Sequence, residues 1–108
     1  MRRGDFVTVA LPGDFGKPRP ALVIQSDSFS TSATVTALLV TSAAVDAPLL
    51  RVRMEPGEQN GLRTASFVMV DKVMTFCRER VGQVIGSASG EVMLEVERAL
   101  TVFLGIAK

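Results

Sequence analysis

The 108-residue chain contains no histidine, tryptophan or tyrosine, and it has a single cysteine, Cys77. Histidine is the side chain whose ordinary pKa lies near neutrality, so its absence excludes a histidine-based triad and a two-histidine ribonuclease mechanism. A lone cysteine can form no intramolecular disulfide, and it has no second cysteine or histidine with which to bind zinc. Base stacking could come only from phenylalanines such as Phe15 and Phe29 or from arginine planes.

Long apolar runs and a marked charge surplus are also missing. No run approaches the roughly 20 residues of a membrane span, and Met1–Asp5 does not resemble the start of a signal peptide, so we expect a cytoplasmic protein. Twelve basic and 11 acidic side chains give a net charge of +1, which is weak support for nucleic-acid binding. The 47% hydrophobic content argues against disorder, and the length suggests one domain over residues 1–108.

The pattern of apolar residues predicts a mainly β fold closed by one helix. The final segment has apolar residues at helical spacing up to Leu104, with Ser87 or Ser89 as the cap and Glu91 in the first turn. Five or six short strands and one helix suggest a small, strongly curved antiparallel sheet or barrel. Strands are predicted over Phe6–Leu11, Ala21–Gln25, Thr34–Thr41, Leu49–Met54 and Ser66–Val70, with Val73–Phe76 continuing extended and a short last strand within Arg78–Ile85.

An arginine between two prolines is the most distinctive local feature. Pro18 and Pro20 have fixed φ angles and push Arg19 out of the helical region, so its guanidinium starts from a stiff backbone beside the second predicted strand. A guanidinium held in this way is suited to binding a phosphate in one defined geometry. The alternative is a turn with a solvated arginine.

Hydroxyls and further arginines are the other candidates for chemistry. Thr41 and Ser42 end an apolar run, although a strand end that caps its own loop is the commoner role of such residues. Arg51 and Arg53 share one face of a predicted strand, where they could contact phosphates or simply be solvated. Arg63 follows a strong turn signal and could also contact a nucleic acid.

Several segments, taken in order, resemble the MazF/PemK/Kid family of bacterial toxin ribonucleases. They are G-D-F-V-T-V from Gly4, R-P-A-L-V-I-Q-S-D from Arg19, the third strand ending at Thr41, V-M-V-D-K from Val68, and the amphipathic last segment. The resemblance implies an SH3-like, CcdB–MazF-type antiparallel barrel of five to six strands with a C-terminal α-helix.

The activity that the resemblance implies is sequence-specific, metal-independent cleavage of single-stranded mRNA. The products are a 2′,3′-cyclic phosphate and a 5′-hydroxyl, and no cofactor is needed. Arg19 and Thr41 match the catalytic positions of the family, and we expect Lys17, Ser42, Arg63, Asp71, Asp14 and Phe15 to contact RNA. Any general acid must be Arg19, Asp14, Asp71 or water. Asp71 could instead be a solvated strand end paired with Lys72.

The family also implies partners and leaves two rival functions open. A MazF-like toxin would form a homodimer and be silenced by a MazE/PemI-like antitoxin, whose acidic segment would occupy the RNA groove. One rival is a non-catalytic, CcdB-like gyrase poison, and the other is an inactive antitoxin-binding barrel. The loop over residues 11–17 is short for the family and lacks its G-S-E-Q-like segment.

Overall fold

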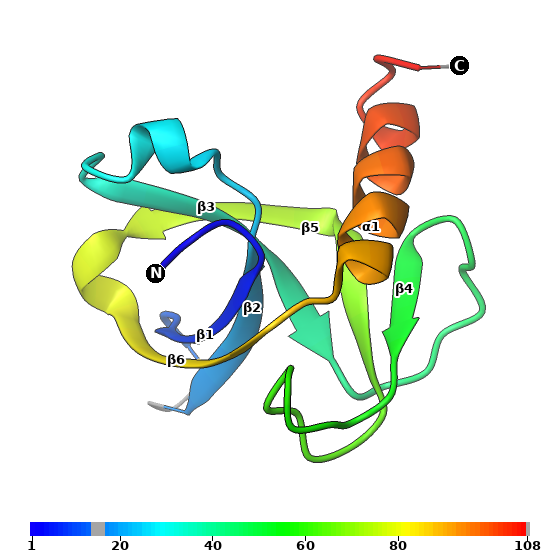
Figure 1. The fold of residues 1–108 in the computed structure, drawn as a ribbon, viewed down its shortest axis with the longest axis horizontal. Helices are drawn as coiled ribbons and strands as arrows, with labels where there is room; N and C mark the ends of the chain where they lie inside the picture. Colours follow the sequence, from blue (N-terminus) through cyan, green and yellow to red (C-terminus); the bar gives the residue numbers. More distant parts are fainter. Residues whose placement is uncertain (14–16, 108) are drawn as a thin grey trace.

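A computed structural model describes residues 1–13 and 17–107 as one curved antiparallel sheet with a helix packed against it (Figure 1). The sheet order is β4-β5-β3-β2-β1-β6, which confirms the predicted mainly β fold with a C-terminal helix. In the described chain, no helix has the length and hydrophobicity needed to cross a membrane. The elements are β1 (Asp5–Ala10), β2 (Pro18–Val23), a 3₁₀ turn (Asp27–Phe29), β3 (Thr34–Thr41), β4 (Arg51–Met54), β5 (Ser66–Cys77), a second 3₁₀ turn (Arg78–Arg80), β6 (Val81–Ser87) and α1 (Gly90–Phe103).

Of the two predicted forms, a strongly curved antiparallel sheet or a barrel, the described strands make the curved sheet, which is not closed by hydrogen bonds. β4 and β6 are the two outer strands, and among the described residues no ladder joins them. β4 is only four residues long and ends at Met54. The connection from β4 to β5 lies against β6 instead, and the Ser87 amide donates to the carbonyl of Gln59 at 2.8 Å.

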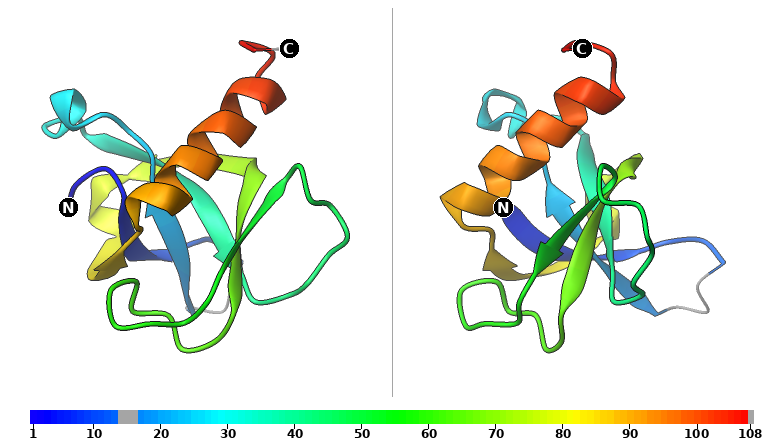
Figure 2. Two further views of the ribbon diagram at one scale, coloured as in Figure 1. Left: turned by 45° about the vertical axis from the view of Figure 1, so that its right-hand side comes forward. Right: turned by 90° about the vertical axis from the view of Figure 1, so that its right-hand side faces the viewer.

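Both faces of the curled sheet are buried. Phe6 and Val7 are neighbours in β1 that point to opposite faces, and both are fully buried. Phe6 belongs to a cluster that includes Val96 and Leu100 of α1, and Val7 belongs to a second cluster with Val23, Val35 and Phe76. Figure 2 shows α1 running obliquely across the face of the sheet to which Phe6 belongs. The first strand is therefore covered on both sides.

Some predicted strand boundaries differ from those observed. β2 begins at Pro18 rather than Ala21, so Arg19 lies in a strand and not in a turn. β5 continues through the predicted break at Asp71–Lys72, because residues on both sides of it pair with a neighbouring strand, Val68 with Val40 and Val73 with Leu38. The last strand begins after the 3₁₀ turn at Arg78–Arg80.

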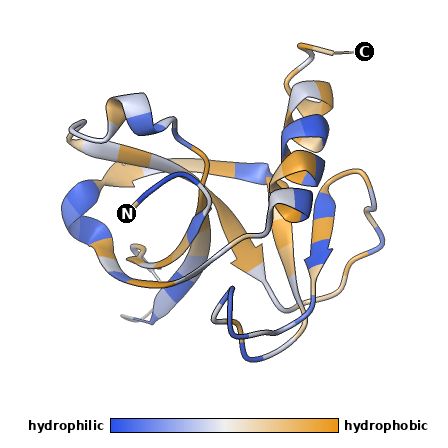
Figure 3. Cartoon of the chain, viewed as in Figure 1, coloured by the Kyte–Doolittle hydropathy of each residue, from blue (hydrophilic) through white to orange (hydrophobic). Residues whose placement is uncertain are grey.

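Helix α1 has the predicted cap and the predicted apolar stripe. The Ser89 hydroxyl accepts a hydrogen bond from the Val92 amide at 3.2 Å, which satisfies one of the first orphan donors of the helix. Val96 and Leu100 are buried, whereas Val102 and Phe103 remain 54% and 45% exposed. Figure 3 shows several hydrophobic stretches along the helix, and Leu94 is exposed as well.

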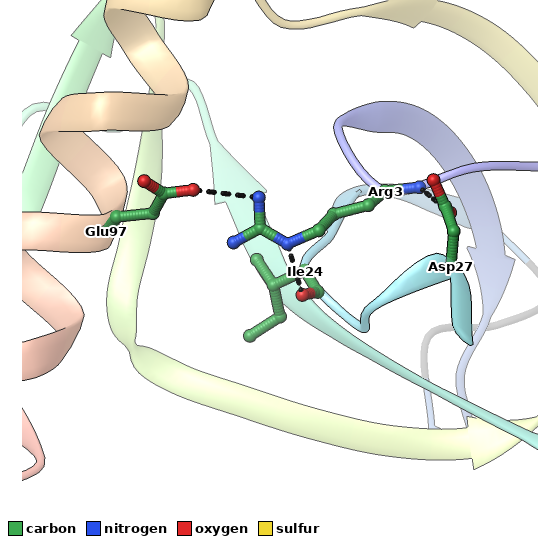
Figure 4. A network of polar contacts seen from close by, with 4 residues as sticks. All are labelled: Arg3, Ile24, Asp27 and Glu97. Carbon is green, nitrogen blue, oxygen red and sulfur yellow. Dashed lines mark hydrogen bonds and ion pairs between the residues drawn. The ribbon is translucent and has the colours of Figure 1, made fainter. Parts of the chain in front are cut away.

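Arg3 ties three parts of the chain together (Figure 4). Its Nε donates to the Ile24 carbonyl at 3.0 Å, and its Nη1 lies 2.8 Å from the Glu97 carboxylate on α1. Its backbone amide donates to Asp27 at 2.7 Å. The N-terminal segment, the end of β2 and the helix are thus held in register by one side chain and its own amide.

A second arginine forms the most buried of the recorded ion pairs. Arg51 of β4 lies 2.6 Å from Asp71 of β5, with side-chain exposures of 12% and 23%. Arg53, two residues along β4, pairs with Glu55 at 2.9 Å, but these side chains are 58% and 70% exposed. Arg51 is therefore not the solvated side chain considered from the sequence, and the partner of Asp71 is Arg51 rather than Lys72.

We expect the two pairs to differ in their contribution to the free energy of unfolding. Asp71→Ala should lower it by about 2 kcal/mol, because Arg51 is left charged in a largely buried site. Glu55→Ala should lower it by less than about 1 kcal/mol, since water screens the exposed pair. Urea denaturation of both variants would measure this, and equal losses would contradict the assignment.

Candidate functional site

The two prolines of β2 open the sheet beside β3. The Ile24 amide donates to the Thr36 carbonyl at 3.2 Å, so the amides of even-numbered β2 residues face β3. Pro18 and Pro20 occupy such positions and have no amide hydrogen to donate. The β2–β3 ladder accordingly ends at the pair Ala21 and Leu39, and beyond this point the two strands are no longer paired.

A groove of about 660 Å³ lies at this opening and brings together four of the predicted site residues, Arg19, Thr41, Ser42 and Arg63. Extending the β2–β3 register by two residues would place Arg19 opposite Thr41. Ser42 follows Thr41, and Arg63 comes from the β4–β5 connection. The whole lining consists of Thr8, Pro18, Arg19, Pro20, Val40, Thr41, Ser42, Gly61, Leu62, Arg63, Thr64, Ser66 and Ile85.

Thr41 is held in place by its own loop. It is half-buried at the end of β3, and its Oγ1 accepts a hydrogen bond from the Ala43 amide at 3.1 Å. The local capping considered from the sequence is therefore present. Accepting this bond uses a lone pair of the hydroxyl and not its proton. The same group can cap the loop and donate into the groove.

The charge of the groove is one-sided. Its described lining contains two guanidinium groups, those of Arg19 and Arg63, and no carboxylate. Both arginines are exposed. No cluster of three or more Asp, Glu or Cys side chains suited to a metal ion occurs among residues 1–13 and 17–107. A bound phosphodiester could meet two cations and several hydroxyls here.

The remaining predicted residues lie elsewhere. Lys17 is exposed just before β2 but does not line the groove. Asp71 is paired with Arg51 and lies four residues along β5 from Phe67, the partner of Thr41, at a distance of roughly 13 Å along the strand. Asp14 and Phe15 lie outside the described residues.

The sequence analysis missed the wall of the groove opposite β2. Gly61 is the last residue of the turn signal at Glu55–Gly61, and Leu62 and Thr64 follow it. That signal predicts a loop but not the position of the loop in space. Thr8 is an ordinary position within β1, and its Oγ1 accepts from the Gln83 amide at 2.9 Å. Ile85 comes from β6, at the other edge of the sheet. No local signal in the sequence joins these segments.

Comparison with known structures shows the same fold in several bacterial toxins. An endoribonuclease in complex with its cognate antitoxin, from a mycobacterial species, superposes with a TM-score of 0.84 at 22% identity, covering 100% of this chain and 98% of that one. The MazF of a MazE–MazF structure from Deinococcus radiodurans gives a TM-score of 0.79 at 26% identity, with 99% and 97% covered.

Sequence comparison identifies the family. A protein named "Probable endoribonuclease MazF" from Mycolicibacterium smegmatis is 48% identical over 99% of both chains. The model of the PemK-like, MazF-like toxins of type II toxin–antitoxin systems matches residues 2–104. This chain therefore belongs to the family of PemK-like, MazF-like toxins of type II toxin–antitoxin systems.

Proposed function

We propose that this toxin is a sequence-specific endoribonuclease that cleaves single-stranded mRNA without a metal ion. The observation that supports the proposal is the groove lined by both Arg19 and Thr41, where a β-strand carrying a guanidinium separates from its neighbour. The relative at 48% identity is named a probable endoribonuclease, which supports the same reaction. The chain acts as one domain over residues 1–108.

The proposed reaction is an internal transesterification. The 2′-oxygen of the nucleotide before the cut attacks the adjacent phosphorus and loses its proton. The bond from phosphorus to the 5′-oxygen of the next nucleotide breaks, and that oxygen gains a proton. The products are a 2′,3′-cyclic phosphate and a 5′-hydroxyl. In this scheme no covalent bond to the protein forms, so the protein acts by positioning and by charge.

Arg19 and Thr41 have different roles in this reaction. Negative charge accumulates on the equatorial phosphate oxygens as the 2′-oxygen attacks, and the Arg19 guanidinium stabilises it with charge-assisted hydrogen bonds. Thr41 donates a neutral hydrogen bond to the same phosphate or orients the attacking hydroxyl. Ser42 and Arg63 bind the strand beside the scissile bond. Lys17, Asp14, Phe15 and Asp71 are further predicted RNA contacts, with Asp71 confined to a flanking nucleotide by its distance along β5.

The proposed partners follow from the family and from the titles of related structures. One mycobacterial relative and the Deinococcus MazF were each solved with an antitoxin, and we propose that an antitoxin of the MazE/PemI type silences this chain in the cytoplasm. An extended acidic segment would suit a groove with two arginines and no described carboxylate.

We also propose that the toxin is a homodimer. A second groove, of about 420 Å³, is lined by Ala47, Pro48, Leu49, Leu50, Ala99, Val102 and Phe103, all of them apolar. Leu49 is 77% exposed, and Val102 and Phe103 are about half exposed. Large apolar side chains gathered in one place on a surface are typical of a protein–protein interface. A second copy of the chain would cover them.

We expect Arg19→Ala to lower kcat for RNA cleavage by at least about 10²-fold, the usual effect of removing a group that stabilises transition-state charge. Arg80→Ala is the matched control, because Arg80 is exposed in the 3₁₀ turn before β6 and does not line the groove. Cleavage of a long mixed-sequence RNA in excess chelator, with the product ends identified by mass, would measure both.

The same assay decides between the proposed function and its rivals. Cuts at a recurring short motif that leave cyclic-phosphate ends support the ribonuclease. RNA that stays intact at high protein concentration would favour the gyrase poison if purified gyrase is inhibited, and the inactive antitoxin-binding fold if it is not. Cleavage that survives Arg19→Ala unchanged would leave the family in place and overturn the site.

The rate of RNA cleavage should depend on the hydroxyl of Thr41 and not on the size of its side chain. Thr41→Ala should lower kcat by about tenfold, because one neutral hydrogen bond is lost. Thr41→Ser keeps the hydroxyl and should retain activity within about threefold of wild type. Single-turnover cleavage of one short RNA measures both, and equal losses in the two variants would exclude a role for the hydroxyl.

The dimer can be tested with a charge placed in the apolar groove. Leu49→Asp should convert the dimer to monomer at micromolar concentration, since a buried unpaired carboxylate is costly. Val84→Asp puts the same charge on a 51% exposed side chain of β6 and should leave the dimer intact. Sedimentation velocity gives both masses, and a monomeric wild type would contradict the proposal.

A further inference from the structure

The far wall of the groove is the β4–β5 connection, residues 55–65, which supplies Gly61, Leu62, Arg63 and Thr64 to the lining. Arg63 forms no ion pair with the other residues that the structure describes, and its side chain is exposed. It is therefore a cation presented to the groove by a loop, and the position of that loop decides what the guanidinium can reach.

Asn60 gives this connection its internal shape. Its Oδ1 accepts from the amides of Gly57 and Leu62, at 3.1 and 2.9 Å, and its Nδ2 donates to the Glu55 carbonyl at 2.8 Å. The Gly61 amide also donates to the Gly57 carbonyl at 3.0 Å. One side chain thus satisfies the hydrogen-bonding needs of three backbone groups of the loop. The segment is therefore a compact turn held by its own hydrogen bonds.

Two glycines let this turn lie directly on β6. A Cβ added at Gly86 would come within 2.3 Å of the Asn60 carbonyl carbon, and one added at Gly61, where φ is +69°, within 1.9 Å of the Ile85 carbonyl oxygen. Both contacts are with backbone, which cannot move aside as a flexible side chain could. The Ser87 amide completes the contact by donating to the Gln59 carbonyl at 2.8 Å.

This backbone contact lies across the open side of the sheet, between the segment that follows β4 and the outer strand β6. Gly61 and Ile85 both belong to it and both line the groove. Leu62, the next residue, packs against the main hydrophobic cluster. A shift of the turn away from β6 would therefore move Arg63 and Thr64 relative to Arg19 and Thr41.

We propose that the contact of Asn60–Gly61 with Ile85–Gly86 is a positioning element that sets the width of the groove. It holds Arg63 and Thr64 against the single-stranded RNA beside the scissile phosphate, and so determines affinity and the choice of cleavage site. This inference rests on the proposed endoribonuclease function. Asn60, Gly61 and Gly86 touch no reacting atom in it; they act through the residues of the wall.

Gly86→Ala tests the contact, with Gly57→Ala as a matched control in the same loop, where an added Cβ meets nothing within 4 Å. On a short RNA that wild type cuts, Gly86→Ala should raise KM by about tenfold, the change expected when one charged contact is lost. Its kcat should stay within about threefold, because Arg19 and Thr41 are not moved. Cut sites on a long RNA should become less selective, and Gly57→Ala should match wild type in all three.

Two further variants keep the test informative if Gly86→Ala does not fold. Asn60→Ala adds no bulk but removes the three side-chain bonds of the turn, and Arg63→Ala removes the cation itself. Both should reproduce the rise in KM without a matching fall in kcat. If KM and the cut sites are unchanged in folded Asn60→Ala and Arg63→Ala, the inference is overturned.

Hydrogen exchange at the Ser87 amide separates this inference from the proposed function, since it needs no RNA. Exchange should be faster in Gly86→Ala than in wild type and Gly57→Ala, because the bond to Gln59 is lost. Unaltered exchange in a folded Gly86→Ala would overturn the contact alone. A wild type that cuts no RNA would overturn the proposed function, and the role in RNA binding with it, whatever the exchange rate.

Discussion

Two missing amide hydrogens shape this molecule more than any single contact. Pro18 and Pro20 sit at the β2 positions whose amides would face β3, and the ladder between these strands stops at Ala21. Hydrogen bonding to β1 continues on the other side of the strand, where Arg19 pairs with Val9. Arg19 is therefore fixed to the sheet on one side and adjoins an opening on the other. A rigid backbone beside a gap is what an electrostatic site needs.

Burial of both sheet faces explains why the separation of β2 from β3 is confined to one end of these strands. Phe6 and Val7, Leu22 and Val23, and Leu38 and Ala37 are adjacent pairs that serve the two hydrophobic clusters in alternation. A sheet that is apolar on both sides must curl or be covered, and here α1 covers one part while the strands curl around the other. Its outer strands then approach each other, and the turn at Asn60–Gly61 fills the space between them.

Local charge matters here more than net charge. A surplus of +1 predicts little attraction to nucleic acid. Several acidic groups are engaged elsewhere, Glu97 with Arg3 and Asp71 with Arg51, and none is found in the described lining of the groove. Among the described lining residues, the charged side chains are therefore those of the two arginines. A weakly charged chain can still gather basic side chains at one groove when several of its carboxylates lie in structural pairs elsewhere.

The sequence by itself determined the class of fold, the capped C-terminal helix and most strands, because these depend on local periodicity and on a motif order shared with the family. Proline geometry and that motif order also made Arg19 and Thr41 the predicted catalytic pair. It placed Asp71 at a strand end, which was wrong, because residues on both sides of Asp71 pair with neighbouring strands and β5 runs to Cys77. It left a curved sheet and a barrel as alternatives, and the described strands form the curved sheet. Only the tertiary structure decided which residues face one another across the groove. Arg63, Thr8 and Ile85 come from segments far apart in the chain, and they line one groove because the sheet must bury two hydrophobic faces. Gly61 and Gly86 also allow the backbone of the β4–β5 connection to lie directly against the backbone of β6.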